Sequence, residues 1–197
     1  MTPYSQTDKT LAYLLKQFAR LFGSITAFDE LNVINKSHEI YSEALRVTEQ
    51  ESARLVKNVY DRTSDKNTME EPEAISLVVT LALAYNPVTK YIFRNEIDRK
   101  RSRFAEGVIA SDAPREEIEL AKRLLIAMTK QFADDATFDA VIQAYKDDGE
   151  SEVEWVTAED DRRCKECAER HGKVYPIDAV PPKPHLHCRC YVKRRTE

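Results

Sequence analysis

The residues best suited to chemistry gather near the C-terminal end of the chain. All 4 cysteines lie between Cys164 and Cys190. The first two form Cys164-Lys165-Glu166-Cys167, a spacing that lets a tight turn aim two sulfurs at one ion. The segment 185–190 follows, with the sequence His-Leu-His-Cys-Arg-Cys, at a separation typical of the two halves of a zinc module. The pattern predicts a structural Zn²⁺ site.

More ligands are available than a tetrahedral zinc ion needs. The five candidates are Cys164, Cys167, His185, Cys188 and Cys190. We favour a set without Cys190, because the spacing from His185 to Cys188 mirrors that of the first pair. Cys190 lies where a last strand should begin and could be a packed thiol. A four-cysteine site stays open as the alternative, and His187 is a weaker sixth candidate.

Other chemistry for these thiols is less well supported. A redox Cys-x-x-Cys normally opens a helix in a parallel βαβ scaffold, and the sequence has no parallel-sheet pattern. A catalytic zinc needs an open coordination position and a nearby general base, yet the chain has no His-x-Glu and its ligand supply already fills the shell. Four unligated thiols in a reducing cytosol would rarely be grouped in this way. We therefore predict a structural ion and no enzymatic activity.

Helices should supply the scaffold that positions this site. Apolar residues recur at helical spacing over most of the first 150 residues, and the chain has only 4 glycines and 8 prolines. The fold class predicted is mainly α, with an α-helical domain over 1–150 and a small zinc-stabilised β-ribbon module over 151–197. The expected helices span 7–22, 29–60, 72–85, about 87–110, 114–134 and 137–146.

Three details of this scheme depend on local signals. The segment 72–85 is so apolar that it should be the central core helix. Asn86-Pro87 should cap and open the next helix. In the module, Gly172 should turn the chain into a short strand, Tyr191–Lys193 should form another, and Trp155 with Tyr175 should pack over the metal ribbon.

Composition and charge restrict the possible partners. With 30 basic against 34 acidic residues, the net charge of −4 gives no whole-chain reason to bind nucleic acid. Local basic groups at 94–103 and at Lys193–Arg195 could touch DNA phosphates, although helix-surface ion pairs are the simpler interpretation of the first. The longest apolar stretch, 75–85, is too short to span a membrane, and no secretory signal is evident, so the cytoplasm is the expected compartment.

A run of motifs resembles a known family. It comprises Trp155, the acidic pair Asp160-Asp161, the first cysteine pair, Gly172-Lys173-Val174, and a proline-rich approach to the segment 185–190. In this order they resemble the C-terminal module of phage head morphogenesis proteins, the minor head proteins similar to the F protein of phage Mu and to that of phage SPP1. A weaker likeness reaches upstream over 85–91 and 96–101.

The resemblance implies a minor capsid protein with no catalytic residues. Such a protein is made in the host cytoplasm, is present in few copies, associates with the portal protein and with capsid or scaffold proteins, and ends in the virion head. A DNA-binding accessory factor acting through the zinc ribbon and the basic tail is the alternative. Two departures stand out. His187 replaces an asparagine or glycine that is common in relatives, and Ala136–Asp139 replaces their Arg-Thr-Glu motif.

Overall fold

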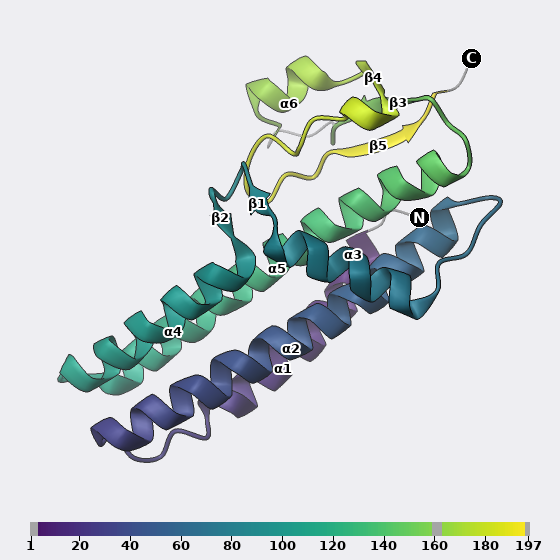
Figure 1. Cartoon of the computed structure of the whole chain (residues 1–197). Coiled ribbons are helices and arrows are strands. Elements are labelled where there is room, and N and C mark those ends of the chain that lie inside the picture. Colours follow the sequence, from purple (N-terminus) through teal and green to yellow (C-terminus); the bar gives the residue numbers. More distant parts are fainter. Residues whose placement is uncertain (1–3, 159–162, 196–197) are drawn as a thin grey trace.

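The computed structural model describes residues 4–158 and 163–195 and is mainly helical, as predicted (Figure 1). Long helices lie side by side as a bundle, and a small sheet with a short helix lies against one end of it. The helices are α1 (Tyr4–Phe22), α2 (Glu30–Thr63), α3 (Glu71–Leu83), α4 (Phe93–Ala110), α5 (Pro114–Asp147) and α6 (Lys165–Arg170).

The helix starts follow from capping residues. The Asp29 side chain accepts a hydrogen bond from the Asn32 amide at 3.0 Å, which satisfies one of the free amides at the start of α2. Glu70 and Glu73 form a reciprocal capping box at the start of α3. Pro114 lies in the first turn of α5, where its missing amide costs nothing.

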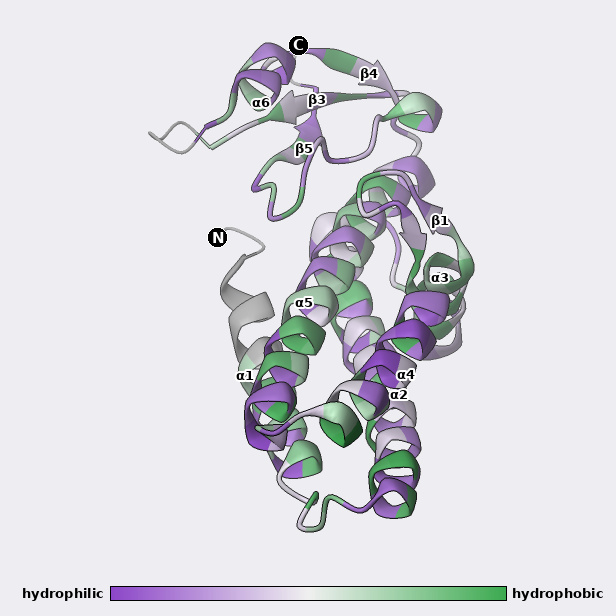
Figure 2. Cartoon of the chain, turned by 90° about the vertical axis from the view of Figure 1, so that its left-hand side faces the viewer, coloured by the Kyte–Doolittle hydropathy of each residue, from purple (hydrophilic) through white to green (hydrophobic). Residues whose placement is uncertain are grey.

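The core of the bundle lies between α2 and α5, each of 34 residues, with α1 and α4 packed alongside. Three aromatic rings from different helices meet in this core, where α1 ends. The ring of Phe22 meets those of Tyr41 and Phe104 edge-on, with centroids 6.1 and 5.5 Å away. Such edge-to-face contacts stabilise a core beyond the area they bury. Figure 2 shows that hydrophobic and hydrophilic residues alternate along these helices.

The prediction that the apolar segment 72–85 is the central core helix is wrong. Helix α3 buries only Ala74, Val78 and Ala82, whereas Ile75 and Leu83 remain 45% and 54% exposed. It packs mainly on α2 at the periphery of the bundle. High apolar content shows that a segment can be buried, but the neighbouring elements decide which face is covered.

The prediction that Asn86-Pro87 opens a helix is also wrong. Strands β1 (Tyr85–Asn86) and β2 (Tyr91–Ile92) form an antiparallel hairpin, and α4 begins only at Phe93. The Asn86 side chain accepts hydrogen bonds from the amides of Val88 and Thr89, at 2.9 and 3.0 Å. This Asx turn uses the same asparagine chemistry as a helix cap, so the sequence signal did not separate the two.

The two helices expected at 114–134 and 137–146 are one continuous helix, α5. No glycine or proline interrupts the segment Ala133–Phe138, and the Thr137 hydroxyl donates to the Asp134 carbonyl at 3.0 Å within the helix. Polar residues that can end a helix are tolerated here because this hydroxyl bonds backward along it. Helix α5 therefore runs from the far end of the bundle to the C-terminal sheet.

The C-terminal part contains an antiparallel sheet in the order β4-β3-β5. Its strands are β3 (Glu152–Val156), β4 (Val174–Pro176) and β5 (Tyr191–Arg194), and a 3₁₀ turn, η1 (Ile177–Ala179), follows β4. The two predicted strands are confirmed, and Gly172 has a positive φ of 75° in the turn before β4. β3 is the central strand. The division of the chain near residue 150 remains a prediction.

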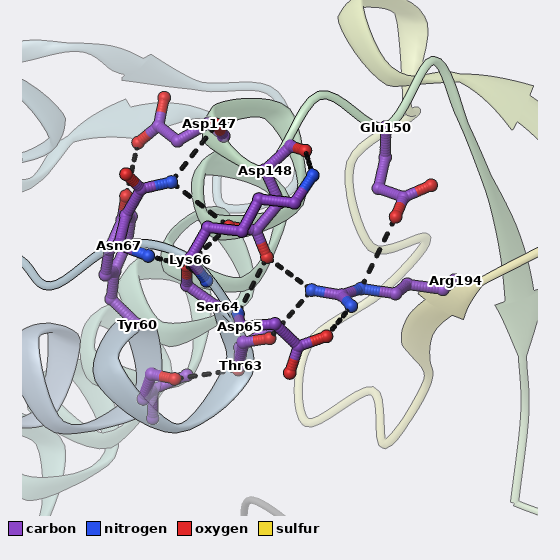
Figure 3. Close-up of polar contacts among 11 residues, drawn as sticks. Tyr60, Thr63, Ser64, Asp65, Lys66, Asn67, Asp147, Asp148, Glu150 and Arg194 are labelled. Atoms are coloured by element: carbon purple, nitrogen blue, oxygen red, sulfur yellow. Dashed lines mark hydrogen bonds and ion pairs between the residues drawn. The ribbon is translucent and has the colours of Figure 1, made fainter.

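A polar network ties the end of α5 to the loop after α2 (Figure 3). Asp148 is only 4% exposed and accepts hydrogen bonds from the Ser64 hydroxyl at 2.6 Å and from the Asp65 amide at 2.9 Å. The hydrogen bond from Ser64 is the main reason why the pKa of Asp148 is lowered to about 2. The carboxylate is therefore ionised at neutral pH and available to a cation.

Arg194 at the end of β5 supplies that cation (Figure 3). Its guanidinium pairs with the carboxylates of Asp148 and Asp65, and its Nε lies 3.6 Å from an oxygen of Glu150. The guanidinium carbon also lies 5.2 Å from the centre of the Tyr145 ring. A strand at the C-terminal end is thus anchored to the helical bundle by both charge and stacking.

Candidate metal centre

The first cysteine pair is positioned by the start of α6. Cys164 is the residue before the helix, and its sulfur accepts a hydrogen bond from the Cys167 amide at 3.3 Å. This amide favours the thiolate form of Cys164, and it lowers the pKa of that thiol. The tight turn expected at the first cysteine pair is present, and one of its backbone amides also stabilises the Cys164 sulfur.

The second half of the cluster lies in residues 185–190, which lead into β5 and are called the ligand loop below. His185 Nδ1 lies 2.9 Å from the Leu186 carbonyl oxygen, and this hydrogen bond is the main reason that its pKa is raised. When Nδ1–H donates to that carbonyl oxygen, Nε2 of the neutral imidazole keeps its lone pair. A fixed tautomer of this kind is typical of metal-ligating histidines. His185 is thus prepared to bind an ion through Nε2.

Cys167 brings the two halves together. Its sulfur lies 3.1 Å from His185 Nε2 and 3.6 Å from the Cys188 sulfur. Two thiolates bound to zinc at about 2.3 Å in a tetrahedron have sulfurs roughly 3.8 Å apart. The spacing of these donor atoms therefore fits coordination of a single ion.

All five predicted ligands meet at this place. Their donor atoms form two groups, each within 4.8 Å, and Cys167 belongs to both. The first group adds Cys164 and His185, and the second adds Cys188 and Cys190. The site can therefore hold a metal ion. Both four-ligand sets named from the sequence take residues from both groups. The choice between the set without Cys190 and the four-cysteine set therefore stays a prediction.

His187 belongs to neither group. Its backbone is left-handed, with φ of 57°, and its amide donates to the Gln131 side-chain oxygen on α5 at 2.8 Å. Glycine and asparagine adopt this conformation with the least strain. His187 therefore holds a backbone conformation that is unfavourable for its residue type, and the hydrogen bond to α5 fixes the ligand loop on the bundle.

The pKa values of the four thiols are shifted in different directions. Hydrogen bonding with Cys188 is the largest cause that lowers the pKa of Cys190 to about 5, whereas burial raises the pKa of Cys167 to about 12. The pKa of Cys188 is also raised, first by its hydrogen bond to Cys190. Without a cation, the cluster therefore ionises only in part. An ion that binds thiolates would favour deprotonation of the remaining thiols.

Trp155 on β3 forms the wall behind the cluster. The side chain is fully buried, and its ring lies 5.6 Å from that of Phe138 on α5 and 6.1 Å from that of Tyr175. Trp155 and Tyr175 pack against each other, and the expectation that they cover a metal-bound ribbon stays a prediction. The indole Nε1 is buried and makes no close hydrogen bond with a described residue, but it faces Cys190 and contributes to lowering the pKa of that thiol. A donor in this position suits a cluster of thiolates.

Sequence reasoning missed Arg170, whose side chain packs on Trp155 and connects separate segments of the module. Its guanidinium carbon lies 5.2 Å from the Trp155 ring centre, and the same group donates to the Pro182 carbonyl at 2.7 Å. A further hydrogen bond joins it to Glu166 at 2.9 Å. Its position three residues after Cys167, at the end of α6, was the only available signal.

The basic segments are neutralised within the chain. Lys193 lies 3.2 Å from Glu154, Arg195 pairs with Glu152 at 2.5 Å, and Arg194 belongs to the acidic network above. Thus Lys193 and Arg194 are part of a strand rather than of a free tail. On α4, Arg99 and Lys100 both pair with Glu96, as the helix-surface interpretation predicted.

Comparison with known proteins identifies the family. The sequence model described as phage Mu protein F like matches residues 95–193, which is half of the chain and includes nearly all of α4, the whole of α5 and the cysteine cluster. The protein belongs to this phage head morphogenesis family. No curated protein and no solved structure matches the chain. The acidic pair Asp160-Asp161 of the family-like motif lies outside the described residues.

Among the helices that the structure describes, none has both the length and the apolar character needed to cross a bilayer.

Proposed function

We propose that the protein is a minor head protein that binds other head components and catalyses no reaction. The observation that carries the proposal is the family match, which covers the metal cluster together with the helices that support it. The portal protein, with capsid or scaffold proteins, is the partner that this role requires. Assembly would take place in the host cytoplasm, and the protein would remain in the virion head.

The chemistry of the cluster supports Zn²⁺ as its ion. Thiolate and imidazole donors at tetrahedral spacing are the ligands that zinc prefers in structural sites. Five candidate ligands for four positions leave no place for a bound water to be activated. The ion would hold α6, the ligand loop and β5 together, and this part of the chain would present a rigid surface to a partner.

A DNA-binding accessory role is the second candidate. It requires basic side chains that are free to meet phosphates. The ion pairs of Lys193, Arg194 and Arg195 count against it, because acidic partners already occupy all three. If the role were real, binding to duplex DNA would weaken steeply as salt is raised.

Particles assembled with altered protein test the proposal. We expect the full-length chain in procapsids and virions, in far fewer copies than the major capsid protein, as quantified by mass spectrometry. Replacing Cys164 and Cys188 together by serine should reduce incorporation, since the module would lose its ion. Lys165→Ser is the matched control, because its side chain is 92% exposed beside Cys164. Absence of the parent protein from both kinds of particle would refute the assignment.

A further inference from the structure

A second candidate site lies where the bundle meets the C-terminal module. A partly open cavity of about 150 Å³ is lined by the β1–β2 hairpin, the middle of α5 and the proline-rich approach to the ligand loop, with the end of α3 and the start of α4 at its edges. Its walls are largely apolar and aromatic and include Tyr91, Phe93, Phe132 and Phe138. A concave, mainly apolar cavity with a few polar groups is the usual form of a ligand site.

The polar groups in this cavity are mostly acidic. Asp135 and Asp139 both line it, four residues apart on α5. Asp135 is held by amide donors, from Asn86 at 2.8 Å and from Gln131 at 2.9 Å. Asp139 has no hydrogen bond or ion pair among the described residues. Burial and the charge of Asp135 raise the pKa of Asp139 to about 6. Its carboxylate is therefore charged at neutral pH but poorly solvated.

One cationic side chain, Lys183, already lies near the two aspartates, and the net charge of the three groups remains negative. Lys183 is only 6% exposed, donates to the Asp134 carbonyl at 3.2 Å, and lies 5.3 Å from the centre of the Phe138 ring. It forms no ion pair with Asp135 or Asp139 within the described chain. The hydroxyl of Thr89 is also buried at the cavity wall, and no described residue lies within hydrogen-bond distance of it in suitable geometry.

We propose that this cavity binds an organic cation, a guanidinium or ammonium group on an apolar stem, with Asp139 as its counter-ion. Aromatic walls attract cations through their ring faces, and the apolar lining accommodates a hydrocarbon stem. Lys183 lowers the pKa of Asp139 without forming an ion pair with it, so a bound cation would give this poorly solvated carboxylate a direct partner that no described residue supplies. Such a group could belong to a free amine or to an arginine or lysine side chain of a partner protein.

The site is connected to the metal cluster by hydrogen bonds. Asp135 accepts from Gln131, and Gln131 in turn accepts from the His187 amide in the ligand loop. A ligand in the cavity would therefore affect the loop that carries His185 and Cys188 through these hydrogen bonds. The inference does not depend on the head-protein role, because it rests on the cavity alone.

Titration of the full-length, metal-loaded protein with agmatine tests the proposal, followed by NMR shifts of the Asn86 side-chain amide and the Thr89 amide. Asp139→Asn should weaken binding by roughly tenfold or more, since it removes a charged hydrogen-bond partner. Lys183→Gln should strengthen binding, because it removes a like charge. Asp98→Asn is the control, as the Asp98 side chain is 76% exposed on α4.

Two further probes complete the experiment. Neutral 1-pentanol should bind much more weakly than agmatine. A capped Gly-Arg-Gly peptide that binds with the same dependence on Asp139 would identify the source as a protein side chain, whereas binding of agmatine alone would identify a free amine; both results support the cation site. Equal binding of pentanol and agmatine, or unchanged affinity in a folded Asp139→Asn protein, would overturn it. The mutation should not prevent folding, since it removes a carboxylate that is costly to bury.

Discussion

Serine in place of Cys167 should abolish stoichiometric metal binding. Cys167 is the only one of the five candidates that belongs to both groups of donor atoms, and it is 4% exposed. Loss of an outer-shell partner costs roughly 10–100-fold in metal affinity, and loss of a first-shell thiolate should cost more. Metal analysis after dialysis against a weak chelator is the measurement. Lys165→Ser, two residues earlier, should keep a full complement.

The same assay separates the two ligand sets. If Cys164, Cys167, His185 and Cys188 bind the ion, Cys190→Ser should retain zinc and His185→Ala should lose it. If the four cysteines bind it, the two variants should behave in the opposite way. Retention of one zinc per chain by the Cys167→Ser protein would contradict both sets.

Alanine in place of Trp155 should destabilise the protein by about 3–5 kcal/mol, the usual cost of emptying a large buried aromatic site. The effect should be near the upper end of that range, because the ring is fully buried and contacts both Phe138 on α5 and Tyr175 on β4. Urea unfolding at one fixed free-zinc concentration is the measurement, since bound metal itself adds stability.

Leu31→Ala provides the comparison for this prediction. Leu31 is 70% exposed near the start of α2, and substitutions at such positions usually change stability by less than about 0.5 kcal/mol. A Trp155→Ala protein as stable as Leu31→Ala would show that the module does not pack on the bundle as described.

The cluster of cysteines with His185 was predictable because its signal is local. The ligand spacing at 164–167 and 185–190 needs no knowledge of the fold, and the structure brings all five candidates together. The amphipathic helices were predictable for the same reason, since their periodicity lies within each segment. The family-like motifs, being short and ordered, also pointed to the family that matches.

The errors arose where one signal fits two structures. An asparagine that caps a helix also closes an Asx turn, so the hairpin at 85–92 looked like the start of α4. Polar residues at 134–137 looked like a helix end, although Thr137 bonds back into α5. Only the tertiary structure resolves such cases, because both alternatives satisfy the local chain.

Long-range pairings could not be predicted at all. Asp139 looks like an ordinary polar residue on a helix, and only the packing of the hairpin and the Pro182-Lys183 segment encloses it in a cavity. Arg194 looked like part of a free basic tail, but it pairs with Asp148, 46 residues earlier, and with Asp65. These contacts depend on how the module docks onto the bundle, and no spacing in the sequence encodes that.

The most direct test of a zinc-held C-terminal module compares the mass of the protein under native and denaturing conditions. The full-length chain, purified under reducing conditions without added metal, should show a native mass larger by one zinc ion, and the difference should vanish on acid denaturation. Acid releases the ion because protons displace it from thiolate and imidazole ligands. Identical masses in the two conditions, with four thiols free to react in the native protein, would contradict the account.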